Sequence, residues 1–349
     1  MKRMERVSVW ILCACLMLGQ AQAQELVLYE ANPNANVHIS ARTSFPEAAT
    51  VEASVYALTL KSWGDEVGEK VMKTQNYEKL VIPESQRDAR YEGTRFIQND
   101  LGTLDIYPKY GEFCYYRDED DDRYILTEMV MDYRRCVDAT QLEDTTALAG
   151  LTKQAAERMT ADFLEAMDID WPMEMTITAF HLPDMRRYAQ EYNGYAMDKL
   201  PVEKWTEHDA FYCVQLIPTV DGIPLDPMDY DMYNGEIMIG NIFSVLIDEK
   251  GVFYCIPWGS FYELQEEVEK LAIINIEEAI EIVSSFYADI LLGAPIEIVD
   301  IRLQYVVVKA GDELVLRPAW CFGYYNSADN MDRAAYWERI DAFTGKRIQ

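Results

Sequence analysis

The chain has 349 residues, of which 50% are hydrophobic and 26% are charged. Such a chain can form two or three packed domains of ~100–200 residues each, and its composition is not that of a disordered protein. Asp and Glu total 60 against 31 Lys and Arg, a formal net charge of −29. Because phosphate backbones and anionic lipid surfaces bind clustered cations, this balance excludes nucleic acid as a partner and argues against docking on an anionic membrane.

The amino terminus has the pattern of an export signal. Three cations lie among the first six residues, and they precede an apolar run over 7–19 that is too short for a bilayer span of ~20 residues. Ala21-Gln22-Ala23 then supplies the small residues that signal peptidase requires. We expect cleavage after Ala23, so that residues 1–23 are a signal peptide and the mature chain is secreted or extracytoplasmic.

A second processing route is open. Leu12-Cys13-Ala14-Cys15 is similar to a bacterial lipobox, in which Cys15 would carry the lipid anchor. The residues after Cys15 are still apolar, which favours simple cleavage. No later segment approaches 18 uninterrupted apolar residues, so we expect no transmembrane span once the signal is removed.

Residues 24–145 predict a β-rich N-terminal segment. Strands are expected over 37–60, with a break at Phe45-Pro46, and over 95–97 and 104–107, on either side of a turn. Further strands are expected over 113–117 and 123–131, joined by a solvated turn at the acidic run 118–122, because five like charges cannot pack.

Residues 146–230 predict a first helix-plus-sheet module. Thr152 is the expected N-cap of a helix whose apolar face carries Ala156, Met159, Phe163 and Met167. A strand over 173–180, a short helix over 184–192 and a strand over 210–218 follow, and the last strand turns at Asp221-Gly222.

Residues 231–349 predict a second module of the same kind. A hairpin is expected from 236–247 and 252–257, followed by a helix capped by Asn275. The apolar face of this helix has five expected members: Ala279, Ile282, Val283, Phe286 and Ile290. Strands over 296–308, 313–324, 336–341 and 346–348 close the chain.

The two predicted helices can be aligned from Thr152 and Asn275, because small, apolar and aromatic residues recur at the same spacing after each cap. The sequence therefore predicts an α+β fold of antiparallel sheets, each covered by a helix. Two related modules after the β-rich segment are one interpretation, and two ordinary amphipathic helices with common spacing are the other.

The last residues carry a resemblance to known proteins. The stretch 337–348, with its Asp-Ala-Phe-Thr-Gly ending, resembles the terminal hairpin of PepSY-like modules. The stretches 301–305 and 316–320 are similar to the C-terminal part of uncharacterised exported proteins and lipoproteins of clostridia, and more loosely to YycH/YycI-type extracytoplasmic regulators. The resemblance covers about 236–349, and residues 151–225 show a weaker form of it. It implies binding or regulation of partners outside the membrane, and no catalytic residue carries over.

Five cysteines follow the signal: Cys114, Cys136, Cys213, Cys255 and Cys321. Their odd number and wide spacing argue against a disulfide framework or a zinc ribbon, and each reads best as a small buried hydrophobe. A disulfide between Cys213 and Cys255 is the weaker alternative.

Motifs for catalysis or metal binding are lacking in the sequence. There is no G-x-S-x-G, H-E-x-x-H or glycine-rich phosphate loop, and His38, His181 and His208 have no acid or nucleophile at an informative spacing. Calcium could bind the acidic run 118–122 or the residues Asp226, Asp229, Asp231 and Asn234 before Gly235, but neither has the spacing of a calcium loop. We therefore assign no catalytic, cofactor or metal residues.

Two functions fit the sequence. The first is a non-catalytic exported protein that binds or regulates a protein or peptide partner at the cell envelope, and its acidic surface would favour a basic partner. The second is a secreted carbohydrate-active hydrolase that uses paired carboxylates, an idea that rests on the many acids and on 23 Tyr and 7 Trp that could stack on sugars.

Overall fold

The computed structural model describes most of the chain between residues 27 and 348. The described residues are 27–44, 52–72, 78–81, 94–108, 110–117, 121–130, 147–195, 199–226, 243–257, 259–290, 292–311, 313–327 and 336–348. The predicted signal peptide, the lipobox and Cys136 lie outside them.

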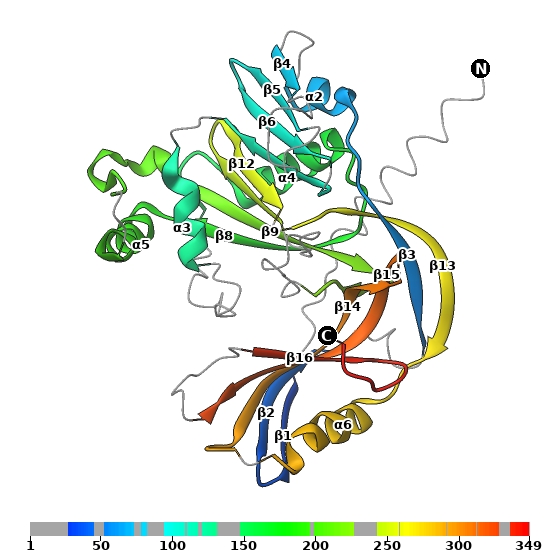
Figure 1. Cartoon of the computed structure of the whole chain (residues 1–349). Helices are drawn as coiled ribbons and strands as arrows, with labels where there is room; N and C mark the ends of the chain where they lie inside the picture. Colours follow the sequence, from blue (N-terminus) through cyan, green and yellow to red (C-terminus); the bar gives the residue numbers. More distant parts are fainter. Residues whose placement is uncertain are drawn as a thin grey trace, which may run out of the picture.

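The fold is mixed α+β with far more strand than helix, and its strands form two sheets (Figure 1). The first has seven strands in the order β1-β2-β14-β15-β3-β13, with β16 also paired to β15. Its strands are β1 (Val27–Asn34), β2 (Val37–Ser44), β3 (Glu52–Leu60), β13 (Tyr262–Ala272), β14 (Ile296–Ala310), β15 (Glu313–Asn326) and β16 (Tyr336–Asp341). This sheet is mixed, not antiparallel as predicted, because β2 enters it beside β14 in the parallel direction.

The second sheet has nine strands in the order β10-β9-β11-β12-β7-β6-β5-β4, with β8 also paired to β9, and it is antiparallel as predicted. Its strands are β4 (Glu78–Val81), β5 (Arg95–Asn99), β6 (Gly102–Tyr107), β7 (Glu112–Tyr116), β8 (Met173–Phe180), β9 (Phe211–Val220), β10 (Ile223–Pro224), β11 (Phe243–Asp248) and β12 (Gly251–Pro257). The expected hairpin residues 236–242 lie outside the described part of the chain.

Short helices complete the structure. The α-helices are α2 (Asp65–Met72), α3 (Ile125–Val130), α4 (Lys153–Ala166), α5 (Leu182–Tyr195) and α6 (Ile276–Ala288), and the 3-10 helices are η3 (Asp122–Tyr124), η6 (Val202–Lys204) and η7 (Glu207–Asp209). No helix within these described ranges is long and apolar enough to cross a membrane.

The two sheets draw on distant parts of the sequence. The predicted N-terminal segment 24–145 contributes β1, β2 and β3 to the first sheet and β4 to β7 to the second. The N-terminal hairpin is fixed to α6 by Asn36, whose side-chain amide donates to the carbonyl oxygens of Tyr287 and Ile290 at 2.7 and 3.0 Å. These bonds tie the turn between β1 and β2 to the carboxyl end of α6.

Each predicted cap begins its helix. The Thr152 hydroxyl accepts a hydrogen bond from the backbone N–H of Ala155 at 3.1 Å, and the Asn275 side chain accepts one from Glu278 at 2.8 Å. Helix α4 packs on the nine-stranded sheet through Ala156, Phe163 and Met167, whereas α6 packs on the seven-stranded sheet. The expectation that each sheet carries a helix is confirmed.

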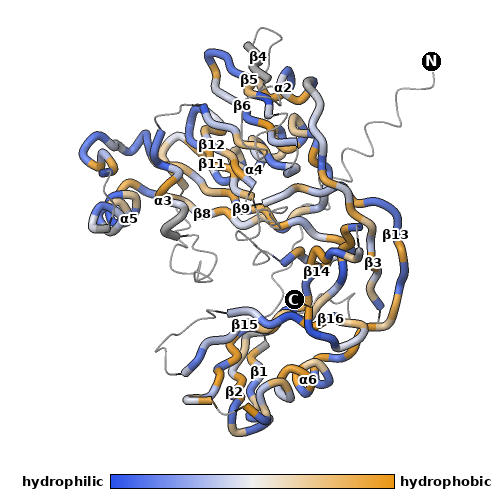
Figure 2. Tube along the Cα trace, viewed as in Figure 1, coloured by the Kyte–Doolittle hydropathy of each residue, from blue (hydrophilic) through white to orange (hydrophobic). Residues whose placement is uncertain are grey.

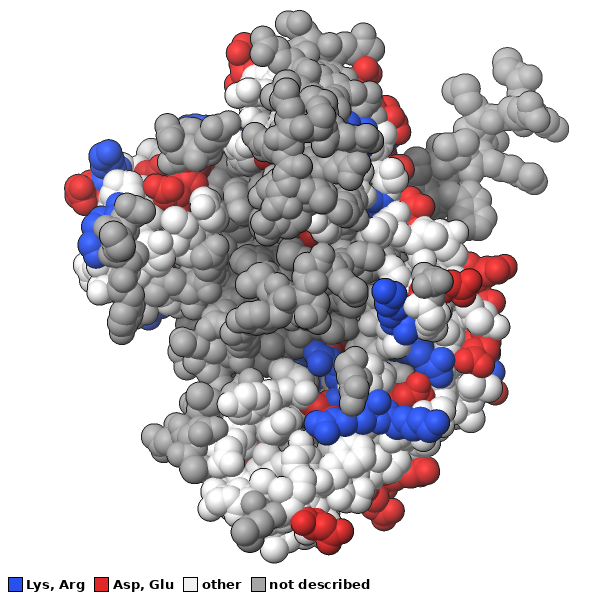
Figure 3. Space-filling model, in the orientation of Figure 1, with Lys and Arg blue, Asp and Glu red and all other residues white. Residues whose placement is uncertain are grey.

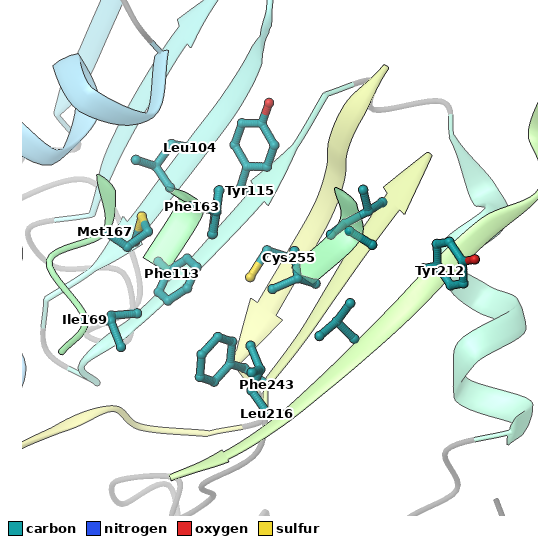
Figure 4. Packing of buried hydrophobic residues seen from close by; sticks show 14 of the residues in the cluster. Leu104, Phe113, Tyr115, Phe163, Met167, Ile169, Tyr212, Leu216, Phe243 and Cys255 are labelled. Carbon is teal, nitrogen blue, oxygen red and sulfur yellow. The ribbon is translucent and has the colours of Figure 1, made fainter. Parts of the chain in front are cut away.

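The core of the nine-stranded sheet forms beneath α4. Figure 4 shows Phe163 and Met167 of the helix region beside side chains from β6 and β7, with Phe243 and Cys255 further along the same face. The rings of Tyr115 and Phe163 lie 5.5 Å apart, a separation typical of favourable aromatic contact. Alternation along β7 buries Phe113 and Tyr115 on this face.

Helix α6 buries a slightly different face from the one predicted. Ala279 and Val283 are buried as expected, but so is Ile280, and Ile290 lies beyond the helix with 48% of its surface exposed. Phe286 is only partly buried against the core, and the guanidinium of Arg347 lies 5.8 Å from the centre of its ring. The buried side of the helix is therefore formed by Ala279, Ile280, Val283 and Ser284.

The prediction of a strand over 123–131 is wrong. This stretch forms η3 and α3, and the side chain of Asp121 accepts a hydrogen bond from the N–H of Arg123 at the start of η3. The Arg123 guanidinium binds Asp121 and Asp248, and it stacks 4.1 Å from the Phe253 ring centre. A buried cation bound to two carboxylates therefore begins this stretch, while residues 118–120 of the expected turn lie outside the described part of the chain.

Most of the described cysteines are buried. Cys213, Cys255 and Cys321 are buried and form no disulfide, whereas Cys114 is only partly buried. Burial raises the pKa of the Cys213 thiol to about 12. Cys213 and Cys255 belong to cores on opposite faces of the nine-stranded sheet. The alternative of a disulfide between them is wrong, because β-strand side chains on opposite faces cannot meet.

The revised helix face gives a stability prediction. We expect Ile280→Ala to lower the free energy of unfolding by about 2–5 kcal/mol, as for a buried aliphatic side chain. Phe286→Ala should cost less than the ~3–5 kcal/mol of a fully buried aromatic residue, because Phe286 is partly exposed. Urea unfolding of both variants tests this, and a larger loss for Phe286→Ala would contradict the assigned face.

A buried carboxyl on β7 gives a pH prediction. Burial raises the pKa of Glu112 from 4.5 to about 7, and its Oε1 has no hydrogen-bond partner among the described residues. Between these two values the unfolded chain releases a proton that the folded chain keeps, so stability falls as the pH rises through this window.

The Glu112→Gln variant removes this titration. At about pH 4.5 we expect its denaturant midpoint to be nearly the same as that of the wild type. At about pH 8 we expect its free energy of unfolding to be higher by about 1–3 kcal/mol. Denaturant unfolding at the two pH values measures the difference. Equal pH dependence of the two proteins would mean that Glu112 is solvated in the folded state.

Candidate functional site

A cleft of about 530 Å³ lies where the two sheets meet. Its walls come from β3, from the connection between α4 and β8, from the end of β9 and from the beginning of β13 (Figure 1). Strand β9 ends in the turn at Asp221-Gly222, and both residues have positive φ angles, 53° and 77°. Asp-Gly favours this tight hairpin turn, which places Asp221 at the rim of the cleft.

An aromatic pair forms one wall. Trp171 and Phe261 meet edge to face, with ring centres 6.1 Å apart. The backbone of Phe261 is fixed on both sides, because its N–H donates to the carbonyl oxygen of Gly111 at 2.7 Å and its carbonyl accepts from the N–H of Lys61 at 2.8 Å. These bonds join the connection after β3 and the start of β7 to β13, so the wall is rigid.

A lysine lies among carboxylates in the cleft. The Lys61 ammonium is 3.2 Å from Glu263 Oε1 and 3.5 Å from Asp168 Oδ2. The side chain of Lys61 is only 11% exposed, whereas those of Asp168 and Glu263 are 69% and 44% exposed. The cation therefore lies at the base, and the carboxylates lie at the opening in contact with solvent.

Tyr56 and Asp221 form a hydrogen-bonded pair in another part of the cleft lining. The hydroxyl of Tyr56 donates to Asp221 Oδ2 at 2.6 Å. Burial, followed by this hydrogen bond, raises the pKa of Tyr56 to about 12, so the phenol stays protonated and acts as a donor. Tyr56 also packs edge to face on Tyr305, at 6.2 Å between ring centres, which links the cleft to the core of the seven-stranded sheet.

Asp168 occupies a backbone position that usually takes glycine. Helix α4 ends in a Schellman motif, in which the N–H of Asp168 donates to Glu165 and that of Ile169 donates to Leu164, at 3.1 and 2.9 Å. Asp168 has a φ of 56°, which is unfavourable for a residue with a Cβ atom. The carboxylate at the rim thus stands where glycine would stabilise the helix end better.

The three histidines are not brought together. His38 lies 3.1 Å from Glu297 on the neighbouring strand, and His208 lies 3.5 Å from Glu249 near the start of β9. His181 immediately precedes the first turn of α5. None of them lines the cleft.

The two stretches considered for calcium are only partly described. Residues 118–120 and 227–242 lie outside the described ranges, and within those ranges no group of three metal-ligating side chains occurs. Asp226, expected to open the second loop, is fully buried and binds the guanidinium of Arg339. Asp121 likewise binds Arg123, so both carboxylates are held by cations.

Sequence reasoning did not find the cleft. Its residues range from Tyr56 to Gln265, and no local spacing connects them. One signal is present in the sequence, the predicted turn at Asp221-Gly222, which places Asp221 at the end of a strand. This signal does not indicate which other residues line the same cleft, because that depends on how the two sheets pack.

Comparisons with known proteins extend the description of the fold. The chain matches no protein-family model and no curated protein. It is similar to the crystal structure of an uncharacterized protein from Eubacterium rectale, with a TM-score of 0.63 and 14% sequence identity over 92% of this chain and 93% of that one. The two proteins share a fold over almost their whole lengths.

The strained end of α4 gives a prediction for the site. We expect Asp168→Gly to raise the free energy of unfolding by up to about 1 kcal/mol, because glycine adopts a positive φ without the steric penalty. The lost ion pair should matter little, since the Asp168 side chain is exposed and Lys61 keeps Glu263. Asp168→Asn, which removes only the charge, is the control. A less stable glycine variant would show that the ion pair outweighs the strain.

Proposed function

We propose that this chain is an exported protein that binds and regulates a partner at the cell envelope without catalysing a reaction. The cleft between the sheets is the part of the surface that first contacts the partner. The predicted export signal, the PepSY-like and YycH/YycI-like resemblance of the C-terminal region, and the two-module interpretation of the helices support this proposal. The lipid-anchored form at Cys15 would place the same surface at the membrane.

The observation that carries the proposal is the arrangement of charges in the cleft. Asp168 and Glu263 share one buried lysine, and Asp221 accepts a hydrogen bond from Tyr56. These carboxylates are fixed at an open rim, where they can pair with cationic groups of a partner. The aromatic wall offers apolar contact beside them. Such a rim of fixed charges around an apolar wall is typical of recognition surfaces.

A carbohydrate-active hydrolase is the second candidate. The cleft brings together Asp168, Asp170, Asp221 and Glu263 beside Trp171, and carboxylates with an aromatic platform are what such an enzyme needs. The exposures favour the first proposal, because a general acid is a carboxyl group kept protonated by burial. Asp168 and Glu263 are instead solvent-exposed partners of Lys61.

Site-specific photo-crosslinking tests the proposal. A photoreactive residue in place of Gln265, which lines the cleft, should give an adduct with one protein in cells that produce and export the chain. The same residue in place of Ser40, an exposed position on β2, is the matched control. The Gln265 adduct should be outcompeted by the unlabelled wild-type protein and weakened by salt, because exposed charge pairs are screened.

Two results would contradict the proposal. One is a Gln265 adduct pattern identical to that of Ser40. The other is turnover on a panel of glycans, peptides and esters that Asp221→Asn abolishes while leaving the unfolding transition unchanged, which would establish the hydrolase instead.

A further inference from the structure

Strand β13 forms an edge of the seven-stranded sheet. In the described part of the chain it pairs with β3 and with no other strand, and in Figure 1 it follows the outer margin of the molecule. Its first residues, 262–265, line the cleft, so the edge leads directly out of the candidate site. An edge strand presents backbone N–H and C=O groups to which another strand can hydrogen-bond.

Both faces of β13 are open to solvent. Every residue over 264–268 is exposed, whereas a strand that covers a core alternates between buried and exposed positions. Three of the exposed side chains are large and apolar: Leu264, Val268 and Leu271, at 36%, 58% and 41% exposure. In Figure 2 hydrophobic and hydrophilic colours both occur along β13. The outer part of β13 therefore carries apolar surface that the fold itself does not bury.

The local sequence does not favour a strand. Glu, Leu, Gln, Lys and Ala make up nearly all of the stretch Tyr-Glu-Leu-Gln-Glu-Glu-Val-Glu-Lys-Leu-Ala, and these residues are helix formers. Pairing with β3 overrides this preference over the whole strand. Natural sequences depart from local consistency chiefly where function requires it. A solvent-exposed strand with helix-forming residues is such a departure.

The charge of β13 is mainly negative. Four glutamates outnumber one lysine along the strand, and two of them, Glu263 and Glu269, pair with Lys61 at 3.2 Å and Arg317 at 3.5 Å. In Figure 3 acidic atoms lie along the margin where β13 runs. Two copies of this edge repel each other when paired, so the acids prevent self-association, whereas they attract a strand that carries cations. The occupant that fits is therefore basic and is not a second copy of this chain.

Two bulges limit the length of an added strand. The register with β3 shifts between Leu264 and Glu267 and again between Glu267 and Glu269, and bulges bend a strand and increase its twist. Glu266 has no ion-pair partner among the described residues, while the hydroxyl of Ser54 donates to Glu267 at 2.9 Å. A short segment can follow such an edge, but a long flat strand cannot.

We propose that β13 binds a short, extended, basic peptide segment of a partner protein by β-strand addition. Backbone hydrogen bonds along the edge hold the segment, lysine or arginine side chains pair with Glu266 and its acidic neighbours, and apolar side chains at alternate positions cover Val268 and Leu264. This inference rests on the proposed function, because it specifies the chemistry of the partner and the strand that binds it.

A synthetic peptide tests this mode of binding. The probe is a short blocked peptide in which lysine alternates with valine, labelled with fluorescein, and its binding to the full chain is followed by fluorescence anisotropy. We expect binding that weakens with salt. N-methylation of the backbone along one edge of the peptide should abolish binding, and methylation along the other edge should not, because an added strand uses only one edge.

Charge reversal at the two edges of the sheet provides the matched control. We expect Glu266→Lys to weaken peptide binding about tenfold, because an attraction between exposed charges becomes a repulsion. Glu30→Lys makes the same charge change at an exposed position of β1, the opposite edge of the sheet, and should leave binding nearly unchanged. Identical unfolding transitions establish that both variants are folded.

Three results would overturn the inference: no binding of the lysine peptide, equal loss in both variants, or equal binding of the two N-methylated peptides. The last two would indicate unspecific attraction to an acidic protein. If the peptide does not bind but crosslinking from Gln265 still captures a specific protein, only the inference of strand addition is contradicted, and the proposed function is retained. Turnover abolished by Asp221→Asn would instead overturn the proposed function.

Discussion

A buried ion pair joins the two sheets, and the cleft depends on it. Asp226 is fully buried at the point where the chain leaves β10, and it binds Arg339 of β16 while its N–H donates to Tyr305 at 2.7 Å. An isolated charge in this position would be strongly unfavourable, so the carboxylate and the guanidinium need each other. Because Leu225 beside it enters the core of the seven-stranded sheet, the end of β9 is tied to the other sheet, and the opening between them keeps its shape.

The pair formed by β3 and β13 is the second connection between the two sheets, and both the cleft and the exposed strand edge lie along it. Both strands extend from the region beside the nine-stranded sheet along the edge of the seven-stranded one (Figure 1). Where β3 ends and β13 begins, the backbone bond between Lys61 and Phe261 forms part of the cleft wall. Further along, β13 forms the acidic edge of the sheet. The cleft and the edge are thus one continuous surface that carries carboxylates. Its apolar parts are the aromatic wall of the cleft and the exposed apolar side chains of β13.

Much of the fold could be predicted from local patterns, and the failures have physical causes. The caps Thr152 and Asn275 and the strand Met173–Phe180 were predicted correctly, because caps and alternation act over a few residues. The stretch after Asp122 was taken for a strand because apolar residues follow an acidic run, but a buried arginine network makes it helical. Strand β13 was not predicted, because its composition favours a helix and only its pairing with β3 makes it extended.

The sequence by itself determined the acidic character of the protein, its α+β class and most of its elements, because these follow from composition and from interactions between near neighbours. Only the tertiary structure decided that β2 lies parallel to β14, that Tyr56 meets Asp221, and that Lys61 lies between Asp168 and Glu263. These contacts join residues more than a hundred positions apart. Loop closure over such distances leaves no periodic trace in the sequence, since it is set by how two complete sheets pack against each other.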